Sequence, residues 1–367
     1  MGSGHIMRCL TLANALRKNG AIVTFICREH PGHLFDLIET SGYQLIRLSA
    51  PKFLSSGNLS SSQMLGVSQK EDAQETMSRM KAIGYCDWLI VDHYSLDIVW
   101  ESAMRSAVKT IMIIDDLANR RHDCDLLLDQ NYYRNLNDRY DGLVPVDCLK
   151  LLGPKYILLK PEFWHARERL RKRDGQVKRI LVFFGGSDPA ELTLKALAAL
   201  EHLNRPDISV DVVVGSTNPI KEKIKNSCKN ISNVSYHFQV TNMPELISNA
   251  DLALGSGGMS MWERCFLGLP AITVVFADNQ LNVTLEAASQ NAIKYLGWAN
   301  QVKISDYHDA LIDMISHPEK TKSMGENAIS MMDATVSTGV WNVIPKILIE
   351  RPILGPFSSG NRYNRPS

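Results

Sequence analysis

The chain has 367 residues, of which 45% are hydrophobic and 22% charged, and its formal net charge is +1 at pH 7. This length accommodates two ordinary domains, and so small a net charge argues against recruitment of nucleic acid or of an anionic membrane. No apolar run approaches the roughly 18 residues that a membrane span needs, and no signal peptide is recognisable. The seven cysteines are scattered without a Cys-x-x-Cys pair, which fits a reducing compartment, so we expect a cytoplasmic protein.

The chain opens with a short glycine turn that leads directly into a predicted helix, with His5 at the junction. Apolar residues follow at Ile6, Leu10, Ala13 and Leu16, the spacing of a buried helix face. A helix N-terminus offers unpaired N–H groups to an anion, and a histidine there can transfer a proton near neutral pH. The segment therefore predicts either an anion site or a plain N-terminal turn with an incidental histidine.

No strand precedes this glycine turn in the sequence, although a turn of this kind normally follows one. The strand would lie in the middle of a doubly wound sheet. We therefore expect a gap in the first sheet, and the gap bears on how firmly His5 is held.

Strands and helices alternate through the rest of the first half. The runs Trp88–Asp92 and Thr110–Asp115 are apolar until their carboxyl ends, as buried parallel strands are. Ligands bind at that edge of an open α/β sheet, so the polar residues there predict a cleft, although each alone is also explained as a solvated loop residue. These residues are Asp92, Tyr94, Asp115 and Asp116.

Residues 161–176 form a charged stretch between two sheet-like regions. Its basic run lacks the interleaved aromatic residues of a nucleic-acid site, so we interpret it as a linker helix. It separates a predicted first domain over residues 1–160 from a second over 177–350. Residues 351–367 are rich in Pro, Gly, Ser and Asn and are predicted to be a disordered tail.

Two glycine turns in the second half each join a predicted strand to a predicted helix, and Pro189 is expected to open the first of these helices. Backbone N–H groups in such turns can face a phosphate. Neither turn matches the dinucleotide fingerprint or the P-loop, which argues against a dinucleotide cofactor and against ATP hydrolysis. Together the turns could hold the two phosphates of a nucleoside diphosphate; their residues are Gly185, Gly186, Ser187, Gly255, Ser256, Gly257 and Gly258.

Three polar residues near the second turn are candidate ligand contacts. Glu263 lies in the following helix, where its carboxylate could accept bonds from both ribose hydroxyls. The alternative is a surface glutamate paired with Arg264. Asp278 fits an N-cap, and the neighbouring Asn279 and Gln280 could reach a ligand.

Metal and serine-hydrolase chemistry are not predicted. The densest donor cluster is His122-Asp123-Cys124-Asp125, which lacks the paired spacing of a zinc site. No Gly-x-Ser-x-Gly elbow is present. We expect neither a metal nor a cofactor.

Six motifs resemble those of one family, and the resemblance covers nearly the whole chain to about Glu350. They are Gly-Ser-Gly-His-Ile-Met-Arg-Cys-Leu-Thr-Leu-Ala at 2–13, Val91-Asp92-His93-Tyr94, Ile114-Asp115-Asp116-Leu117, Gly185-Gly186-Ser187-Asp188, Gly255–Pro270 and Ala277-Asp278-Asn279-Gln280. They are similar to motifs of the UDP-2,4-diacetamido-2,4,6-trideoxy-β-L-altropyranose hydrolases of pseudaminic acid biosynthesis. The resemblance implies an α/β chain of GT-B architecture, with two Rossmann-like doubly wound domains facing across a cleft. It also implies a metal-independent hydrolase in which water replaces UDP at the anomeric carbon.

The resemblance further implies a role for each candidate residue. His5 would take a proton from the attacking water, and UDP would be held by both glycine turns with Glu263, Asn279 and Gln280. The sugar would be held by Gly4, Arg8, Asp92, Tyr94, Asp115 and Asp116.

Two other functions stay open from the sequence. One is a GT-B glycosyltransferase with the same donor site, and the other is an inactive UDP-sugar-binding protein. In each case the expected partner is a small-molecule UDP-sugar, without nucleic acid or membrane. The oligomeric state is left open, and a monomer is compatible with the sequence.

Overall fold

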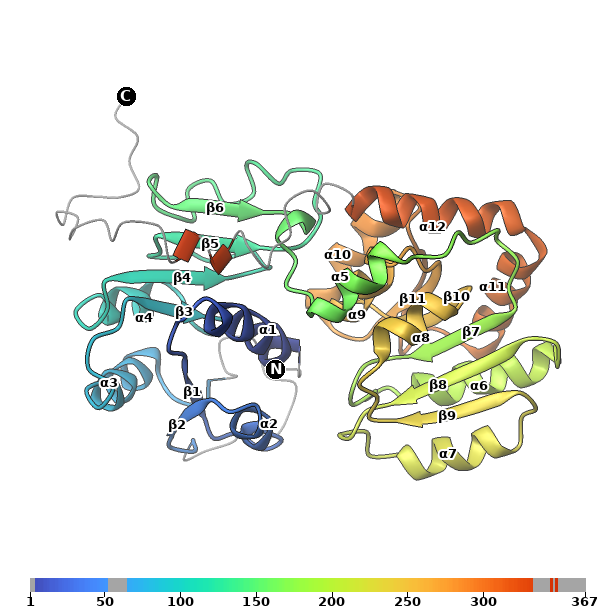
Figure 1. Ribbon diagram of the computed structural model, residues 1–367, viewed down its shortest axis with the longest axis horizontal. Coiled ribbons are helices and arrows are strands. Elements are labelled where there is room, and N and C mark those ends of the chain that lie inside the picture. Colours follow the sequence, from blue (N-terminus) through green and yellow to red (C-terminus); the bar gives the residue numbers. More distant parts are fainter. Residues whose placement is uncertain (1–3, 52–64, 333–343, 346, 349–367) are drawn as a thin grey trace. The chain divides into compact units, whose positions relative to one another are not determined.

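The computed structural model describes residues 4–51, 65–332, 344–345 and 347–348, and the chain divides into two compact units (Figure 1). The N-terminal unit comprises residues 1–131, 135–158 and 337–367, and the C-terminal unit comprises residues 132–134 and 159–336. The chain therefore returns to its first unit: the indole Nε1 of Trp88 donates to the carbonyl of Leu348 at 2.9 Å. The prediction had instead run the second domain to residue 350. The predicted tail over 351–367 lies outside the described residues.

The N-terminal unit consists of parallel strands and connecting helices, and its strands form two sheets. One sheet pairs β1 with β2, and the other has the order β3-β4-β5-β6. Among the described residues, β1 and β3 each pair on one side only, and every residue of β1 is half-buried. This division agrees with the gap expected in the first sheet. The elements are α1 (Gly4–Lys18), β1 (Thr24–Arg28), α2 (Phe35–Thr40), β2 (Gln44–Leu48), α3 (Gln69–Met80), β3 (Trp88–Val91), α4 (Ile98–Met104), β4 (Thr110–Ile114), β5 (Leu126–Asp129), β6 (Leu149–Leu152) and a short 3-10 turn (Pro154–Tyr156).

The C-terminal unit contains one six-stranded parallel sheet with the order β12-β11-β10-β7-β8-β9. This is the doubly wound order, and the strand sequence reverses between β7 and β10. The elements are α5 (Pro161–Glu168), β7 (Arg179–Phe183), α6 (Leu192–Leu203), β8 (Ser209–Val214), α7 (Lys221–Lys229), β9 (Val234–Phe238), α8 (Met243–Asn249), β10 (Leu252–Ser256), α9 (Met259–Phe266), β11 (Ala271–Val275), α10 (Asp278–Ser289), β12 (Lys294–Trp298), α11 (Ile304–Ser316) and α12 (Pro318–Met332).

The main core of the C-terminal unit lies between this sheet and helices α6, α7 and α11. Val182, Val212 and Ile272 from three strands are all 0% exposed, and they pack in one cluster with Leu311 of α11. Burying each such side chain stabilises the fold by about 1.5–3 kcal/mol. The apolar runs that predicted buried strands therefore form the interior of the sheet and hold its carboxyl edge rigid.

Two helices of this unit begin differently from the prediction. Helix α6 begins at Leu192 rather than at Pro189, because the Asp188 carboxylate accepts the N–H groups of Leu192 and Thr193, both at 2.9 Å. The prediction that Pro189 opens the helix was therefore wrong. Asp278 is the first residue of α10 and does not cap it; the N-cap position belongs to Ala277, without a side-chain cap.

The stretch over residues 161–176 packs within the C-terminal unit. Helix α5 lies against α8 and α9, and Arg173 donates to backbone carbonyls at the C-terminal ends of both, among them Ile247 at 2.8 Å and Leu267 at 2.7 Å. A guanidinium placed there satisfies carbonyls that a helix end leaves without partners. Residues predicted as a linker thus tie two helix ends together.

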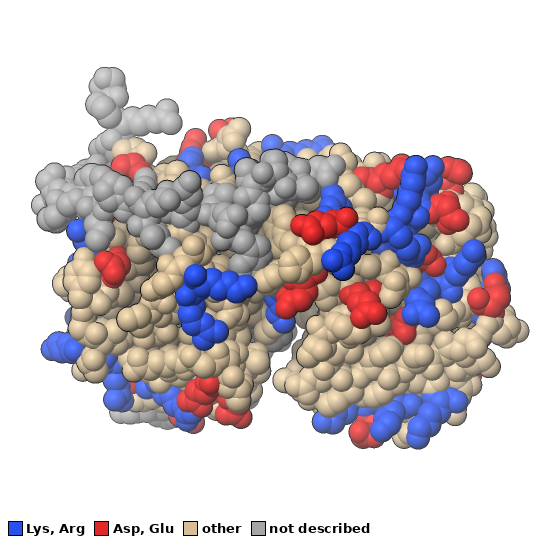
Figure 2. Space-filling view, viewed as in Figure 1, with Lys and Arg blue, Asp and Glu red and all other residues tan. Residues whose placement is uncertain are grey.

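Surface charge is mixed on the face shown in Figure 2, where basic and acidic side chains lie interspersed over both units. Within the described part of the chain, no helix combines the length and the apolar character needed to cross a bilayer.

Candidate functional site

The first candidate site lies where the start of α1 meets the end of β3. His5 and Arg8 stand about one turn apart on α1, so both side chains leave the same face of the helix. The carboxylate of Asp92, the residue after β3, contacts both. Its Oδ1 lies 2.6 Å from His5 Nδ1, and it accepts Arg8 Nε and Nη2 at 2.6 Å each. The Arg8–Asp92 pair is therefore bidentate, the geometry of a strong ion pair.

Charge in this cluster is balanced by the protein itself. Burial alone would raise the pKa of Asp92, but the charge of Arg8 and the hydrogen bonds from Arg8 and His5 outweigh it and hold this pKa well below its usual range. Burial would likewise lower the pKa of Arg8, yet Asp92 and Asp116 raise it overall. Both groups stay ionised, and their pairing fixes Asp92 against His5.

The orientation of His5 leaves one ring nitrogen available. The hydrogen bond to Asp92 places the proton on Nδ1, so Nε2 keeps a lone pair. Among the described residues, no hydrogen-bond partner of Nε2 is present, and the side chain is 11% exposed. The ring of Tyr94 meets His5 edge-on, with centroids 4.6 Å apart. A histidine held in this way can act as a base at Nε2.

The two aspartates after β4 have different environments. Asp116 Oδ2 accepts Arg8 Nη1 at 3.1 Å and the hydroxyl of Tyr94 at 3.2 Å, which joins it to the His5 cluster. Asp115 is 0% exposed and bonds Arg120 Nη1 at 2.6 Å and the Ala118 N–H at 2.8 Å. A buried carboxylate with these partners stabilises its own loop. The sugar contact predicted for Asp115 stays a prediction, and the structure adds these structural contacts to it.

Three groups near this cluster were not singled out by the sequence. The thiol of Cys9 donates to Asp92 Oδ2 at 3.4 Å. Burial lowers the pKa of His93 to about 3, so this ring is neutral; its Nδ1 accepts the Ser95 N–H at 3.0 Å. Asp129 at the end of β5 accepts the Tyr140 hydroxyl at 3.0 Å, and burial raises its pKa to about 7. Cys9 and His93 stand inside two of the motifs quoted above, but only folding brings them and Asp129 near one another.

The second candidate site lies at the carboxyl ends of β7 and β10, where the strand order of the other sheet reverses. Both predicted glycine turns follow these strands, and ligands bind at such switch points. The helices that follow the two turns differ in how their N-termini are capped. The N-terminus of α6 is capped by the buried Asp188 carboxylate. The N-cap of α9 is Gly258, with φ 81° and no side-chain cap. Of the two helix ends, α9 is the one without a protein anion.

Close packing explains the glycines of the second turn. A Cβ on Gly255 would lie 2.6 Å from Arg264 Nη1 and 2.8 Å from the carbonyl oxygen of Phe183. A Cβ on Gly257 would lie 2.6 Å from Thr284 Oγ1. Gln280, also a predicted contact, bonds the Phe276 N–H through Oε1 at 3.2 Å, and its amide lies next to Gly258. Asn279 is exposed at the start of α10, and Ser187 is exposed in the first turn.

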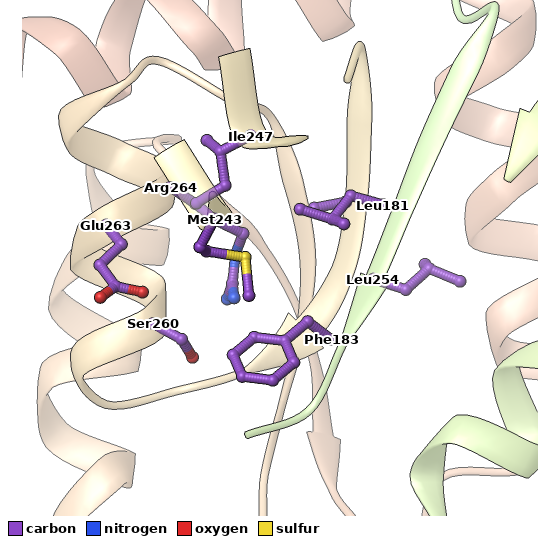
Figure 3. A pocket seen from close by; sticks show the side chains of 9 residues that line it. Leu181, Phe183, Met243, Ile247, Leu254, Ser260, Glu263 and Arg264 are labelled. Carbon is purple, nitrogen blue, oxygen red and sulfur yellow. The ribbon is translucent and has the colours of Figure 1, made fainter. Parts of the chain in front are cut away.

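A narrow pocket, too small to hold a water molecule, lies next to the second turn, between β7, β10, α8 and α9. Glu263, Ser260 and Arg264 line it from α9, and the side chains of Ser260, Arg264 and Phe183 converge on it (Figure 3). Burial raises the pKa of Glu263 to about 7, against the charges of Lys160 and Arg264. The alternative of a surface glutamate paired with Arg264 does not hold: no ion pair joins the two side chains in the described part of the chain, although each charge affects the pKa of the other. The remaining lining residues, which sequence reasoning missed, are Leu181, Met243, Ile247, Ala253 and Leu254.

The cluster around residues 122–125 is held by protein contacts. His122 Nδ1 lies 2.7 Å from Glu101 Oε1, and the Cys124 sulfur lies 3.5 Å from that of Cys148. Among the described residues, no group of three His, Cys, Asp or Glu side chains is arranged to hold a metal ion.

Residues 180–337 match the model of the glycosyltransferase family 28 C-terminal domain. A UDP-2,4-diacetamido-2,4,6-trideoxy-β-L-altropyranose hydrolase of Campylobacter jejuni is 24% identical over 76% of this chain and 89% of its own length. The spore coat polysaccharide biosynthesis protein SpsG of Bacillus subtilis is 34% identical over 40% of this chain and 43% of its own. An uncharacterized protein of Methanocaldococcus jannaschii is 28% identical over 77% of this chain, but the match spans only 54% of that relative.

Solved structures resemble the chain over most of its length. MurG of Acinetobacter baumannii aligns with a TM-score of 0.59 at 14% identity, covering 90% of this chain and 92% of its own. UGT89C1 of Arabidopsis thaliana, solved with UDP-L-rhamnose, aligns with a TM-score of 0.62 at 13% identity, covering 95% and 97%. The predicted architecture is confirmed: the chain has the GT-B fold, and its C-terminal unit is similar to the C-terminal domain of family 28 glycosyltransferases.

Proposed function

We propose that the chain is a hydrolase of a nucleoside-diphosphate sugar, and that its substrate is UDP-2,4-diacetamido-2,4,6-trideoxy-β-L-altropyranose. The observation that carries the hydrolytic step is the 2.6 Å contact between His5 Nδ1 and Asp92, which leaves Nε2 of a partly exposed ring as an available base. The relative from Campylobacter jejuni, which carries this activity in its name, supports the choice of sugar.

The proposed reaction is one displacement at the anomeric carbon. A water molecule gives a proton to His5 Nε2 while its oxygen bonds to that carbon, and the bond from the carbon to the diphosphate oxygen breaks. UDP leaves with the electron pair. Asp92 stabilises the imidazolium that forms, because its carboxylate already accepts the Nδ1 proton. Arg8 and Asp116 are positioning residues, since they hold Asp92 and the Tyr94 ring around His5.

The proposed UDP site is the second glycine turn with the start of α9. The uncapped helix end there suits an anion, and donors aimed at the diphosphate would also stabilise charge on the leaving group. Glu263 would accept the ribose hydroxyls.

A glycosyltransferase is the second candidate, favoured by the family 28 match over residues 180–337. It would use the same UDP-sugar, with an acceptor hydroxyl in place of water. An inactive UDP-sugar-binding protein, the third possibility, would bind UDP without turnover.

The first experiment incubates the purified chain with this UDP-sugar in ¹⁸O-water, without an acceptor, and identifies the products by mass spectrometry. Hydrolysis at the anomeric carbon gives labelled free sugar and unlabelled UDP. Label in UDP would instead mean attack at phosphorus and would contradict the proposed mechanism. Tight UDP binding without turnover would contradict hydrolysis and favour one of the two alternatives.

A matched variant separates chemistry from binding. In His5→Gln the base is lost, and we expect kcat to fall by about 10²–10⁴-fold. UDP affinity should stay within about twofold, because His5 belongs to the other unit's candidate site. Equal turnover by the variant and the wild type would exclude His5 as the base.

A further inference from the structure

Arg264 is a buried cation directly beneath the second glycine turn. It lies on α9, its side chain is 2% exposed, and Nη2 donates to the carbonyl of Ser256 at 2.7 Å. Its Nη1 is so near the turn that a Cβ on Gly255 would lie 2.6 Å away. The guanidinium also lines the narrow pocket described above (Figure 3).

This guanidinium is incompletely satisfied. Its Nε is buried without a hydrogen-bond partner, and no carboxylate in the described part of the chain lies within 4.0 Å of it. Burial lowers the pKa of Arg264 to about 10, so the group is still charged at neutral pH. Buried charges are normally paired, because an unpaired one loses its hydration without compensation.

Arg173 shows what a satisfied buried arginine looks like in the same unit. Its guanidinium donates to carbonyls of five residues at the ends of α8 and α9, including Ala250 at 2.9 Å. Arg264 makes one such bond. The presence of a buried arginine without a counter-ion therefore requires an explanation. Arg264 lies under a helix end without a side-chain cap, where a bound anion would serve as its counter-ion.

We propose that Arg264 is the built-in counter-charge for the diphosphate bound on the turn over residues 255–258. Arg264 acts through the turn in two ways. Its hydrogen bond positions the carbonyl of Ser256, and its charge attracts the anion across the backbone of the turn. The guanidinium can approach the turn this closely because residue 255 is a glycine, without a Cβ. Its charge therefore contributes to phosphate affinity and not to recognition of the nucleoside. The identity of the nucleoside, uridine, is taken from the proposed function. The binding of a diphosphate at this turn is argued from Arg264 and the turn themselves.

The test compares uridine, UDP and inorganic pyrophosphate by isothermal titration calorimetry on the full chain. In Arg264→Met we expect UDP and pyrophosphate affinity to fall about tenfold to hundredfold, while uridine affinity changes less than about threefold. Arg264→Lys keeps the charge and should retain most of the preference for UDP over uridine. The control is Arg205→Met, which removes an exposed charge paired with Asp207 at the opposite edge of the sheet.

Thermal unfolding without ligand provides a second readout. Replacing an unpaired buried charge by an apolar side chain should leave the melting temperature unchanged or raise it. A merely structural arginine would lower it, and would lower the affinities of uridine and UDP alike.

The outcomes separate the two proposals. Pyrophosphate binding that depends on Arg264, without any affinity for UDP or uridine, would support the counter-charge and overturn the uridine nucleotide as ligand. An unchanged ratio of UDP to uridine affinity in Arg264→Met would overturn the counter-charge and leave the proposed function standing. Failure of the wild type to bind either UDP or pyrophosphate would overturn both.

Discussion

Two buried arginines, one in each unit, differ in their ion-pair partners. Arg8 is 3% exposed and meets Asp92 and Asp116, while Arg264 is 2% exposed and has no carboxylate at ion-pair distance among the described residues. Each lies in the first turns of a helix, α1 or α9. The first is neutralised within the protein and holds a histidine in place. The second keeps its charge beneath a helix end suited to an anion. If the proposed functions are right, charge balance, more than residue type, distinguishes the two sites.

The same substitution at the two arginines should give opposite changes in stability. Arg8→Met leaves the buried Asp92 carboxylate without its main partner, so the free energy of unfolding should fall by about 3–5 kcal/mol. In Arg264→Met, the free energy of unfolding should not fall. Chemical denaturation of both variants measures the difference, and equal losses would refute the contrast drawn between the two sites.

The role of Asp92 can be tested through turnover. Asp92→Asn removes the negative charge that fixes the proton on Nδ1 and would stabilise the imidazolium, so kcat should fall by about 10²-fold or more, with UDP affinity unchanged. Asp116→Asn is the matched control, because that carboxylate contacts Arg8 and Tyr94 but not His5. If both variants lost activity equally, Asp92 would have no special relation to His5.

The C-terminal site should respond to pH through Glu263. Its pKa in the folded chain is about 7, so ionisation is completed only above that pH. Uridine affinity should therefore rise by up to about tenfold between pH 6 and pH 8 if the carboxylate accepts ribose hydroxyls. Glu263→Gln should be insensitive to pH over this window. A pH-dependent affinity in that variant would assign the titration to another group.

The same pKa has a consequence for stability. An ordinary glutamate has a pKa near 4.3, so between about pH 4.3 and pH 7 the folded chain binds more protons at Glu263 than the unfolded chain does. The contribution of Glu263 to stability is therefore fully present at low pH and declines as pH rises through this window. Denaturation of the wild type and of Glu263→Gln at both ends of the window gives the difference.

The smallest effect is expected at the first glycine turn. Asp188→Ala removes the cap of α6 and should lower the free energy of unfolding by about 0.5–2 kcal/mol. Asp188→Asn, which can still accept a hydrogen bond and tolerates the positive φ of 41° at this position, should lose less. If the α6 end binds the diphosphate instead of the α9 end, Asp188→Ala would strengthen UDP binding; we expect no such gain.

Much of the fold was predictable because it depends on local pattern. Apolar runs ending in polar residues marked strands β3 and β4, of which β4 is buried and β3 is mostly half-buried, and glycine clusters marked the turns after β7 and β10. The start of α6 was misplaced because a proline at the helix entrance is a weaker signal than the carboxylate before it. Asp188 belongs to one of the motifs, but the motif does not reveal that its carboxylate accepts the N–H groups of Leu192 and Thr193, and these bonds decide where the helix begins.

For this protein, the sequence by itself determined the alternation of elements, the two-domain architecture and the candidate residues at the strand ends. Such features follow from the periodicity of apolar side chains and from the special backbone of glycine. Only the tertiary structure decided which candidates face outward. Asp115 is enclosed while Asp116 joins the His5 cluster, and Arg264 is buried without an ion pair. Burial and charge pairing depend on contacts between residues far apart in the chain, so a local sequence pattern cannot predict them.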